Sequence, residues 1–523
     1  MSHPTPVTPV DAAPGRVTDR IAADRVVVDD GLARRLAGVC AQVSVDDGER
    51  AEAGRDWWPL AIGWAAAGSV PGRPSAIARP ASTPEVAAVL ALCNEAGVPV
   101  TAAGGRSGVC GASVPVFGGV TLDLCGLAGI ADVDETSLVA DLRAGTFGPD
   151  VESGLREGHG LTLGHWPQSM ALSTVGGWLA CRGAGQYSNR YGKIEDMVLG
   201  LEVVLADGTV VRTGGHGPRA ATGPDLTQVF VGSEGTLGVI TEGRFRVHPV
   251  PDGSGRRAFG FPSFADGLEA CRRILRRGAT PAVLRLYDAT ESGRSFDRPD
   301  TNVLIVADEA DPGLVDATLA IVDQECGTGQ VLDAALVERW MTQRNDVSAL
   351  APLWRGGIVV DTVEVSARWS ALPGLYRAVL DALGGIEGTM AASSHQSHAY
   401  TDGACLYFTF AGRQGGTGRS GDDPGPGPGR DAWAERYYTA AWDAVTATTE
   451  AAGGAISHHH GIGLNRARFL PGALGPAFGV LSAIKQSLDP RGILNPGKLG
   501  LPTPFGSPGW PLRSGAGVPG DHP

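Results

Sequence analysis

The string VGSEGTLGVIT, residues 231–241, is the most informative segment of this sequence. Glycines and hydroxyl residues fill its first half, and an apolar run follows. Because glycine has no Cβ, a loop of this composition lets several backbone N–H groups converge on one anion. Apolar and polar residues then alternate over residues 239–247. The segment therefore predicts an anion-binding loop at the start of a strand.

Two further loops in the same part of the chain share this composition. Residues 101–111 read TAAGGRSGVCG, and residues 173–185 read STVGGWLACRGAG. Taken alone, the first of these is more simply a glycine-rich turn, and its spacing is not that of the GxGxxG dinucleotide fingerprint. Three such loops in one module are harder to explain as independent turns. A pyrophosphate is the ligand that suits the backbone N–H groups of these loops.

The segments around these loops alternate between helix and strand. Thr83–Ala96 is expected to be a helix with Thr83 as its N-cap, and Gly97 is expected to end it. Residues 98–101 and 120–124 are short apolar runs typical of strands. This order favours an α/β module.

The module continues with strands and ends at a proline-rich exit. Residues 196–206, DMVLGLEVVLA, are expected to be a long buried strand or a strand pair. The Asp207-Gly208 dipeptide is a hairpin turn signal, and residues 209–212 form the returning strand. Pro249 and Pro251 then mark the end of the module.

A second region with a different pattern of helices and strands follows. Phe264–Arg276 has a helical pattern, whereas residues 302–307 and 405–410 are typical of strands. Residues 412–430 are too polar and glycine-rich to pack, so we expect a disordered loop. A helix over residues 431–452 then leads to a compact C-terminal segment.

Composition limits the classes of function. Of the 523 residues, 43% are hydrophobic and 19% charged, which is enough apolar material for two or three globular domains. The formal net charge is −13, so nucleic acid and anionic membrane are not expected as main partners. The eight cysteines are scattered without a CxxC pair. This argues against a disulfide framework or a zinc site and favours a cytoplasmic location.

The two ends carry no targeting or membrane signal. The N-terminus lacks the basic-then-apolar order of a signal peptide, and no uninterrupted apolar window of about 18 residues predicts a spanning helix. Residues 1–16 and 502–523 are rich in proline, glycine and small polar residues. We therefore expect both to be disordered.

Together with NRYGKIED, residues 189–196, the three loops resemble the FAD domain of the vanillyl-alcohol-oxidase type. The resemblance implies a flavoenzyme with a two-subdomain, PCMH-type FAD-binding domain over about residues 71–251. Some relatives attach FAD through a histidine at the position of Arg106, so non-covalent FAD is implied here. The residues implied to contact FAD are Thr101, Ala102, Ala103, Gly104, Gly105, Arg106, Ser107, Gln168, Ser169, Met170, Ala171, Leu172, Ser173, Thr174, Cys181, Arg182, Gly183, Ala184, Gly232, Ser233, Glu234, Gly235, Thr236, Leu237, Gly238 and Ile240.

The rest of the chain resembles the alkyldihydroxyacetonephosphate synthase family of ether-lipid synthesis and its bacterial FAD-linked relatives. The matching strings include DTVEVSARWS (residues 361–370), YTDGACLYFTF (400–410), ISHHHGIG (456–463) and LDPRGILNPGKL (488–499). The resemblance implies that Tyr407 and His459 act in catalysis, flanked by His458 and His460, and that Arg285 lies near the flavin. The implied activity is a transferase reaction, the exchange of an acyl group for a fatty alcohol through a flavin N5 adduct.

These resemblances imply an α+β chain, with an antiparallel sheet and flanking helices in its cap. The expected parts are a partly disordered N-terminal segment (1–55), the FAD-binding domain (56–251), a cap or substrate domain (252–445) interrupted by the loop 412–430, a C-terminal FAD-linked oxidase segment (446–500) and a disordered tail (501–523). A small-molecule or lipid-like substrate is expected. A homodimer and a peripheral membrane contact are left open.

Two differences from the synthases leave the substrate open. The synthases have an arginine ahead of the segment that matches DTVEV, but the corresponding residues here, 348–354, contain none in register. Arg344 and Arg355 flank this stretch and would need a loop shift to replace it. A second family arginine is replaced by His395. His395 and His398 are the expected substrate contacts, yet a phosphate dianion is held better by arginine than by neutral histidine. Oxidation of a 2-hydroxy acid or related alcohol by hydride transfer to flavin is therefore the alternative activity. Flavin or lipid binding without turnover is a third reading.

No metal is expected at the triple histidine. On an extended chain His458 and His460 face one way and His459 the other, so the three side chains cannot ligate one ion unaided.

Overall fold

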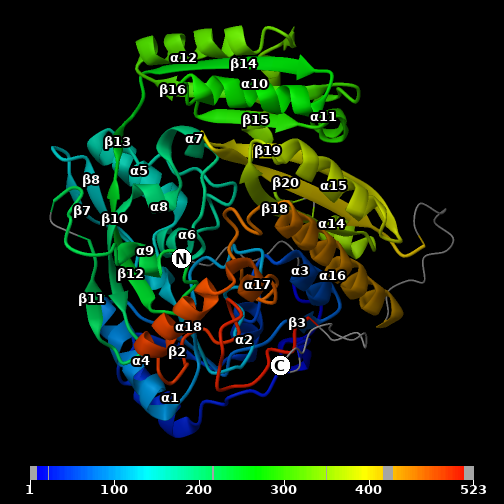
Figure 1. Cartoon of the computed structure of the whole chain (residues 1–523). Coiled ribbons are helices and arrows are strands. Elements are labelled where there is room, and N and C mark those ends of the chain that lie inside the picture. The colour runs from blue at the N-terminus through cyan, green and yellow to red at the C-terminus, as the bar shows by residue number, and fades with distance from the viewer. Residues whose placement is uncertain (1–8, 22, 215–216, 349, 416–427, 512–523) are drawn as a thin grey trace.

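Two smaller sheets form one end of the molecule, and a seven-stranded antiparallel sheet forms the other (Figure 1). This computed structural model describes residues 9–21, 23–214, 217–348, 350–415 and 428–511. The smaller sheets come from residues before 250, whereas the large sheet begins at Gly253. The expected α+β class, with a two-part N-terminal domain and a cap, is confirmed.

The first small sheet carries the first glycine-rich loop. Its strand order is β2-β4-β6-β5, with β4, β6 and β5 parallel. Parallel strands bring their carboxyl ends to one edge of a sheet, and the loop after β5 leaves from that edge. The elements are β2 (Gln42–Ser44), β4 (Ala76–Arg79), α4 (Thr83–Ala96), β5 (Val100–Ala103) and β6 (Val120–Asp123).

Helix α4 has the expected bounds but not the expected cap. Ser82 occupies the N-cap position in an extended conformation. Thr83 is the first helical residue, and its hydroxyl donates to Glu202 Oε1 at 2.7 Å. The capping role expected of Thr83 is wrong because a carboxylate of the neighbouring sheet binds that hydroxyl.

The second small sheet is antiparallel, in the order β11-β10-β12-β8-β7. The strand expected over residues 196–206 starts two residues later, because Asp196 lies in α8, where its carboxylate accepts from the Lys193 backbone N–H at 2.9 Å. The elements are β7 (Ile130–Asp134), β8 (Val139–Arg143), α5 (Gly148–His159), α6 (Val175–Cys181), α8 (Ile194–Met197), β10 (Val198–Val204), β11 (Val210–Arg212) and β12 (Val239–Arg246).

The cap sheet has two faces with different neighbours. Its order is β17-β14-β16-β15-β19-β20-β18. Leu284 and Leu286 point into a core shared with the covering helices, whereas Val283 and Tyr287 pack on the opposite face. The strands are β14 (Gly253–Phe261), β15 (Val283–Tyr287), β16 (Asn302–Ala310), β17 (Gln330–Leu332), β18 (Val359–Arg368), β19 (Thr389–Ala399) and β20 (Gly403–Gly412), and the covering helices are α10 (Phe264–Arg276), α12 (Pro312–Glu325), α15 (Leu372–Gly384) and α16 (Pro428–Ala451).

The chain returns to the FAD domain after the cap. Helix α16 ends at Ala451 and packs against α15 and β18 of the cap, so the expected boundary at residue 446 falls inside a helix. Beyond the helix, Leu494 pairs with Val100 of β5, and Asn495 Nδ2 donates to the Ala112 and Glu234 carbonyls at 2.9 and 2.6 Å. The C-terminal segment is thus a structural part of the FAD domain.

The described parts of both ends are packed, contrary to expectation. The Asp11 N–H donates to the Ala65 carbonyl at 2.8 Å. The Trp510 ring lies 5.3 Å from that of Trp58 and 5.6 Å from that of Trp64. Disorder over residues 9–16 and 502–511 was wrong because these residues have buried partners in the core. Residues 1–8 and 512–523, and residues 416–427 of the expected loop, lie outside the described residues.

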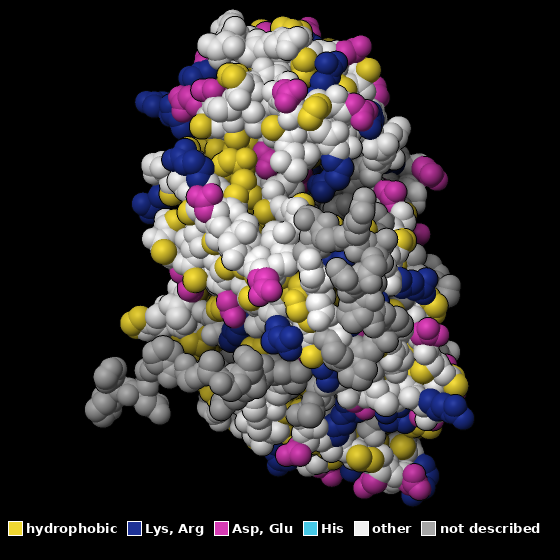
Figure 2. Space-filling model, turned by 90° about the vertical axis from the view of Figure 1, so that its right-hand side faces the viewer, with side chains coloured by type: hydrophobic (Ala, Val, Ile, Leu, Met, Phe, Trp, Pro, Cys, Tyr) yellow, Lys and Arg dark blue, Asp and Glu magenta, His cyan; other side chains and the backbone are white. Residues whose placement is uncertain are grey.

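The charged side chains on the surface are of both signs (Figure 2). On the face in Figure 2, basic and acidic side chains are interspersed. None of the helices in the described part of the chain combines the length and the apolar character needed to span a bilayer.

Candidate active site

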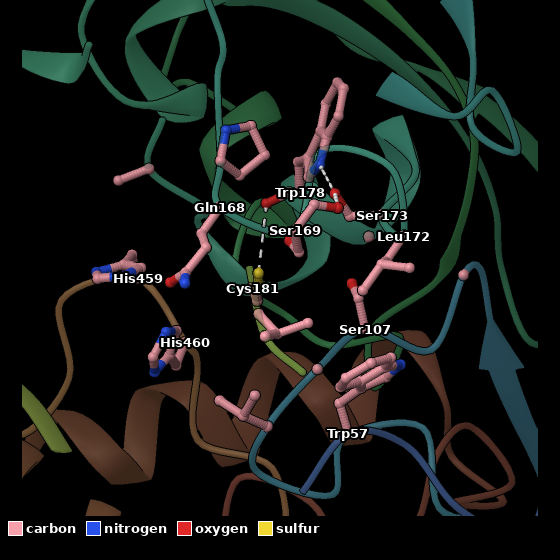
Figure 3. Close-up of a pocket in the computed structure, with 18 of the residues that line it drawn as sticks. Trp57, Ser107, Gln168, Ser169, Leu172, Ser173, Trp178, Cys181, His459 and His460 are labelled. Atoms are coloured by element: carbon pink, nitrogen blue, oxygen red, sulfur yellow. Dashed lines mark hydrogen bonds between the residues drawn. The ribbon is translucent and has the colours of Figure 1, made fainter. Parts of the chain in front are cut away.

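A cavity of about 620 Å³ lies where the cap sheet meets the FAD domain. Its walls come from the three glycine-rich loops, from the cap strands β15, β18, β19 and β20, and from His459 and His460. In Figure 3, His459 and His460 reach it from the C-terminal segment, facing Gln168, while Ser107 lies on another wall. The three expected loops therefore meet at one site.

Glycine lets the first two loops interlock. A Cβ on Gly104 would lie 2.3 Å from Thr174 Oγ1, and one on Gly105 would lie 2.0 Å from the Leu172 carbonyl oxygen. Thr174 caps α6 by accepting from the Gly177 N–H. The loops thus form a cradle of backbone groups, and Arg106, in a left-handed conformation, adds a positive charge to it.

Most of the expected FAD contacts line this cavity. The lining residues among them are Ala102, Ala103, Gly104, Gly105, Arg106, Ser107, Gln168, Ser169, Leu172, Ser173, Thr174, Cys181, Gly183, Ala184, Glu234, Gly235, Gly238 and Ile240. Those outside the lining are Thr101, Met170, Ala171, Arg182, Gly232, Ser233, Thr236 and Leu237. Arg182 instead pairs with Glu195, while Met170 and Ala171 line an adjoining cavity.

Glu234 connects the third loop to the histidine turn, by which we mean residues 457–463. Its carboxylate accepts from the Ile462 and Gly463 N–H groups at 2.5 and 2.8 Å. Burial raises the pKa of Glu234 to about 7. A Cβ on Gly461 would lie 2.3 Å from Glu234 Oε1, which explains the glycine after the third histidine.

A buried carboxylate on β18 holds the histidine turn from the other side. Glu364 Oε1 accepts from the N–H groups of His458, His459 and His460 at 3.2, 3.0 and 2.8 Å. Its other partner is the guanidinium of Arg466, which is also fully buried. Burial raises the pKa of Glu364, but Arg466 and His460 outweigh that effect and hold the pKa well below its usual range.

Tyr407 lies at the centre of the cap face that lines the cavity. It stands directly across from Glu364 on β18 and from His395 on β19. Its hydroxyl and His460 Nε2 are 3.1 Å apart. Burial raises the pKa of Tyr407, so the phenol is protonated at neutral pH.

A second carboxylate–imidazole pair lies beside Tyr407. His395 Nδ1 is 2.8 Å from Glu291 Oε2, and its Nε2 is 2.6 Å from Arg285 Nη2. Because arginine only donates, Nε2 accepts, and the ring proton is on Nδ1. Burial lowers the pKa of His395, and its ring stacks between Tyr287 and Tyr407. His395 is thus a neutral residue with a fixed tautomer.

A register shift brings His398 to the same cavity. Residues three apart on a regular strand face opposite sides, but β19 carries an irregularity between Gln396 and His398. The His398 ring stacks on His458 at 5.0 Å and meets His459 edge-on at 5.0 Å. Ligand nitrogens of these three residues lie within 4.8 Å of one another. His458 and His459 thus approach each other, contrary to the expected alternation, because they lie on a turn. His460 is not part of this group, and the absence of a metal stays a prediction.

An arginine pair lines the cavity, and the sequence predicted a site role for only one of its members, Arg285. The guanidinium carbons of Arg285 and Arg344 each lie 5.5 Å from the Trp340 ring centroid. Arg285 Nε and Arg344 Nη1 are buried and have no hydrogen-bond partner among the residues that the structure covers. Both side chains line the cavity. Arg344 lies at the C-terminal end of α13 (Ala335–Gln343).

The cavity fits a dinucleotide, and comparisons with known proteins identify which one. Its volume is typical of cofactor sites, and its loops offer neutral backbone groups with one arginine. A family model for an FAD binding domain matches residues 74–214, and one for the C-terminal domain of FAD linked oxidases matches residues 256–499. The chain belongs to the FAD-linked oxidase family. Its cofactor is FAD, as expected.

Relatives of this FAD-linked oxidase include both oxidoreductases and synthases. It is 31% identical to the uncharacterized FAD-linked oxidoreductase YgcU of Escherichia coli, over 82% of this chain and 89% of the relative. It is 30% identical to alkyldihydroxyacetonephosphate synthase of Dictyostelium discoideum, over 83% and 74%. A solved alkyldihydroxyacetonephosphate synthase covers 91% of this chain and 87% of its own with a TM-score of 0.72 at 26% identity. The expected family is confirmed.

Proposed function

We propose that this protein is an FAD-dependent enzyme for an anionic substrate, and that it exchanges an acyl group for a fatty alcohol in the manner implied by its synthase relatives. The observation that carries the proposal is the pair Arg285 and Arg344 on Trp340. A buried guanidinium nitrogen without a partner costs free energy, so a cavity with two of them suits an oxyanion.

The residues opposite this pair suit proton transfer at the substrate carbon. Burial and neighbouring histidines lower the pKa of His459 well below its usual range, so it is neutral and able to accept a proton. Tyr407, held by His460, is a neutral hydrogen-bond donor. FAD, when bound, supplies an electrophilic ring system for the substrate carbon.

An adjoining cavity of about 470 Å³ suits the hydrocarbon chain. It is lined in part by Trp57, Pro149, Met170, Leu172 and Val347. Trp57, Leu172 and Val347 also line the first cavity, so the two spaces meet. A lipid-like anion requires a cavity with an apolar part for its chain next to cationic residues for its charged group.

Oxidation of a 2-hydroxy acid is the second candidate. The E. coli relative is an FAD-linked oxidoreductase, and His395 stands, neutral, where the synthases have an arginine. A carboxylate carries less charge than a phosphate dianion, so the two remaining arginines suit it as well.

One anaerobic experiment separates the two activities. FAD-loaded protein is mixed with acyl-dihydroxyacetone phosphate plus a labelled fatty alcohol, and separately with 2-hydroxy acids. We expect label in the product and an unchanged flavin spectrum in the first mixture. Bleaching by a hydroxy acid, without incorporation of the alcohol, would reject the exchange in favour of oxidation.

The anion site has its own test. Arg344→Gln should raise KM by about 10- to 100-fold because it removes a charged hydrogen-bond donor. The matched control is Arg355→Gln, at an exposed position at the end of α14 (Leu350–Arg355). Equal KM values for the two variants would show that the charged end binds elsewhere.

A further inference from the structure

Five side chains behind the cavity wall form a continuous chain of hydrogen bonds. His459 Nδ1 is 2.9 Å from His458 Nδ1, and His458 Nε2 is 3.0 Å from the Tyr400 hydroxyl. The Tyr400 hydroxyl is 3.2 Å from Ser188 Oγ, which is 2.8 Å from His398 Nδ1. Each group can both donate and accept a proton, so the links form one path.

The path begins and ends at the cavity. His459 and His398 line it, whereas the three groups between them, His458, Tyr400 and Ser188, are not among the lining residues. Ser188 lies on α7 (Ser188–Tyr191) of the FAD domain, and His398 and Tyr400 come from the cap. The path therefore crosses from the histidine turn through the cap to the FAD domain and back to the cavity.

One set of tautomers makes every link point the same way. His459 Nδ1–H donates to His458 Nδ1, and His458 Nε2–H donates to the Tyr400 oxygen. The Tyr400 O–H donates to Ser188 Oγ, and the Ser188 O–H donates to His398 Nδ1. This leaves His459 Nε2 as an acceptor at one end and His398 Nε2–H as a donor at the other. All five groups stay neutral in this arrangement.

We propose that these five groups are a proton relay that takes a proton at His459 and delivers it at His398. The proton accepted at His459 Nε2 displaces its Nδ1 proton to His458. In turn one proton passes to Tyr400, one to Ser188 and one to His398 Nδ1, which then releases its Nε2 proton into the cavity. One proton enters, one leaves, and no electrons move. The source of that proton, the substrate, rests on the proposed function.

The relay suits a reaction that must return a proton at a second point. Removal of a proton from the substrate carbon and protonation of a leaving group occur at different atoms. In the structure, His398 and His459 meet edge to face, and no direct hydrogen bond links them within the described part of the chain. The route through Tyr400 therefore supplies the connection. Tyr400 and Ser188 are relay residues that do not contact the substrate.

The surroundings keep the path fixed. Lys193 Nζ donates to the His458 carbonyl at 2.6 Å and pairs with Glu195. Glu364 holds the His458 N–H from the other side. These contacts involve the backbone of His458, so its two ring nitrogens remain available to the relay.

The hydrogen-bond chain is tested without any substrate. FAD-loaded protein with ¹⁵N-labelled histidine is compared with Tyr400→Phe and Ser188→Ala by NMR of the ring nitrogens. We expect both variants to shift the nitrogens of His458 and His398. The matched control is Tyr437→Phe, whose hydroxyl contacts Thr389 elsewhere in the cap and should shift none of them. Unshifted spectra in both relay variants would overturn the proposal, whatever the reaction.

Proton transfer is tested with whichever activity the wild type shows. Tyr400→Phe and Ser188→Ala should each lower kcat by about 10²-fold, with KM and the flavin spectrum unchanged. Their solvent deuterium isotope effect should differ from that of the wild type, which loss of packing alone does not cause. Wild-type kcat and isotope effect in both variants would overturn the relay. Shifted NMR signals without acyl exchange in the wild type would reject the exchange but not the hydrogen-bond chain.

Metal analysis of the purified protein is a third test of the relay. A metal ion at His398, His458 and His459 would take the place of the proton between the two adjacent histidines. One tightly held equivalent of transition metal in the purified holoenzyme would therefore overturn the relay. Metal-free protein with full activity supports it.

Discussion

At the scale of single residues, the cavity contains a histidine whose ring nitrogens have no partner. His165 is fully buried, and neither nitrogen has a hydrogen-bond partner among the residues described. Its ring lies 4.7 Å from that of Trp178. Burial and the charge of Lys193 lower its pKa to about 3. A buried polar ring left unpaired inside a cofactor cavity points to a ligand contact.

The same residue predicts a pH dependence of stability. Because the folded pKa lies below the unfolded value, the unfolded state binds more protons as the pH falls through about 6.5. His165 therefore lowers the free energy of unfolding by about 2 kcal/mol between pH 7 and pH 5. His165→Phe should remove that part of the slope. Urea unfolding of the FAD-loaded proteins measures it, and identical slopes would contradict the assignment.

Some of the residues that line the cavity could be predicted from the sequence, and others could not. Tyr407 and His459 were found through family motifs, and both line the cavity. Arg344 was not found through a family motif, because its position at the cavity depends on how α13 packs within the cap. The histidines were expected to alternate as on an extended chain, whereas Glu364 binds their three backbone amides and makes a turn.

At the scale of elements, strand register places the side chains that line the cavity. The strand expected over residues 405–410 is β20, and pairing with β18 and β19 sets Tyr407 between Glu364 and His395. Period-two alternation predicts which side chains share a face, but it contains no information on partners across the sheet. The irregularity that turns His398 inward was likewise not readable from the sequence.

The histidine turn should depend on its carboxylate. Glu364→Gln leaves Arg466 buried without a charge partner, which should cost about 3–5 kcal/mol. The matched control is Glu338→Gln, which breaks an exposed pair with Arg256 and should cost about 0–1 kcal/mol. Both are measured by urea unfolding. A small loss for Glu364→Gln would mean that the other contacts of the turn, including those of Glu234 and Lys193, are enough to hold it.

The C-terminal tail gives a second prediction at this scale. Trp510, in contact with Trp58 and Trp64, should cost about 3–5 kcal/mol when replaced by alanine. Val331→Ala, on an exposed position of β17, should change stability by at most about 0.5 kcal/mol. Thermal unfolding compares them, and equal melting temperatures would restore the expectation of a disordered tail.

At the scale of the whole molecule, the cavity is built from three separated regions. The loops before residue 250, the cap and the histidine turn all contribute to one cavity. The sequence predicted the two-part domain and the cap because family motifs cover most of the chain. It did not predict that residues near each end of the described chain pack against a hydrophobic core, since their composition resembles that of a disordered segment.

FAD should be held without a covalent bond. Arg106 occupies the position at which the resemblance places an attaching histidine. Acid precipitation of the purified protein should therefore release all the flavin into the supernatant. Flavin fluorescence that stays with the washed pellet would show that another residue attaches it.

The pairing of Leu494 with Val100 has a consequence for biosynthesis. Strand β5 is made early in translation, yet its neighbour and the Asn495 side chain that ties two loops together emerge from the ribosome about 390 residues later. The whole cap is synthesised in the interval. Flavin capture is thus a late event in the life of each nascent chain, and the half-made site must be kept from aggregating until the last segment arrives.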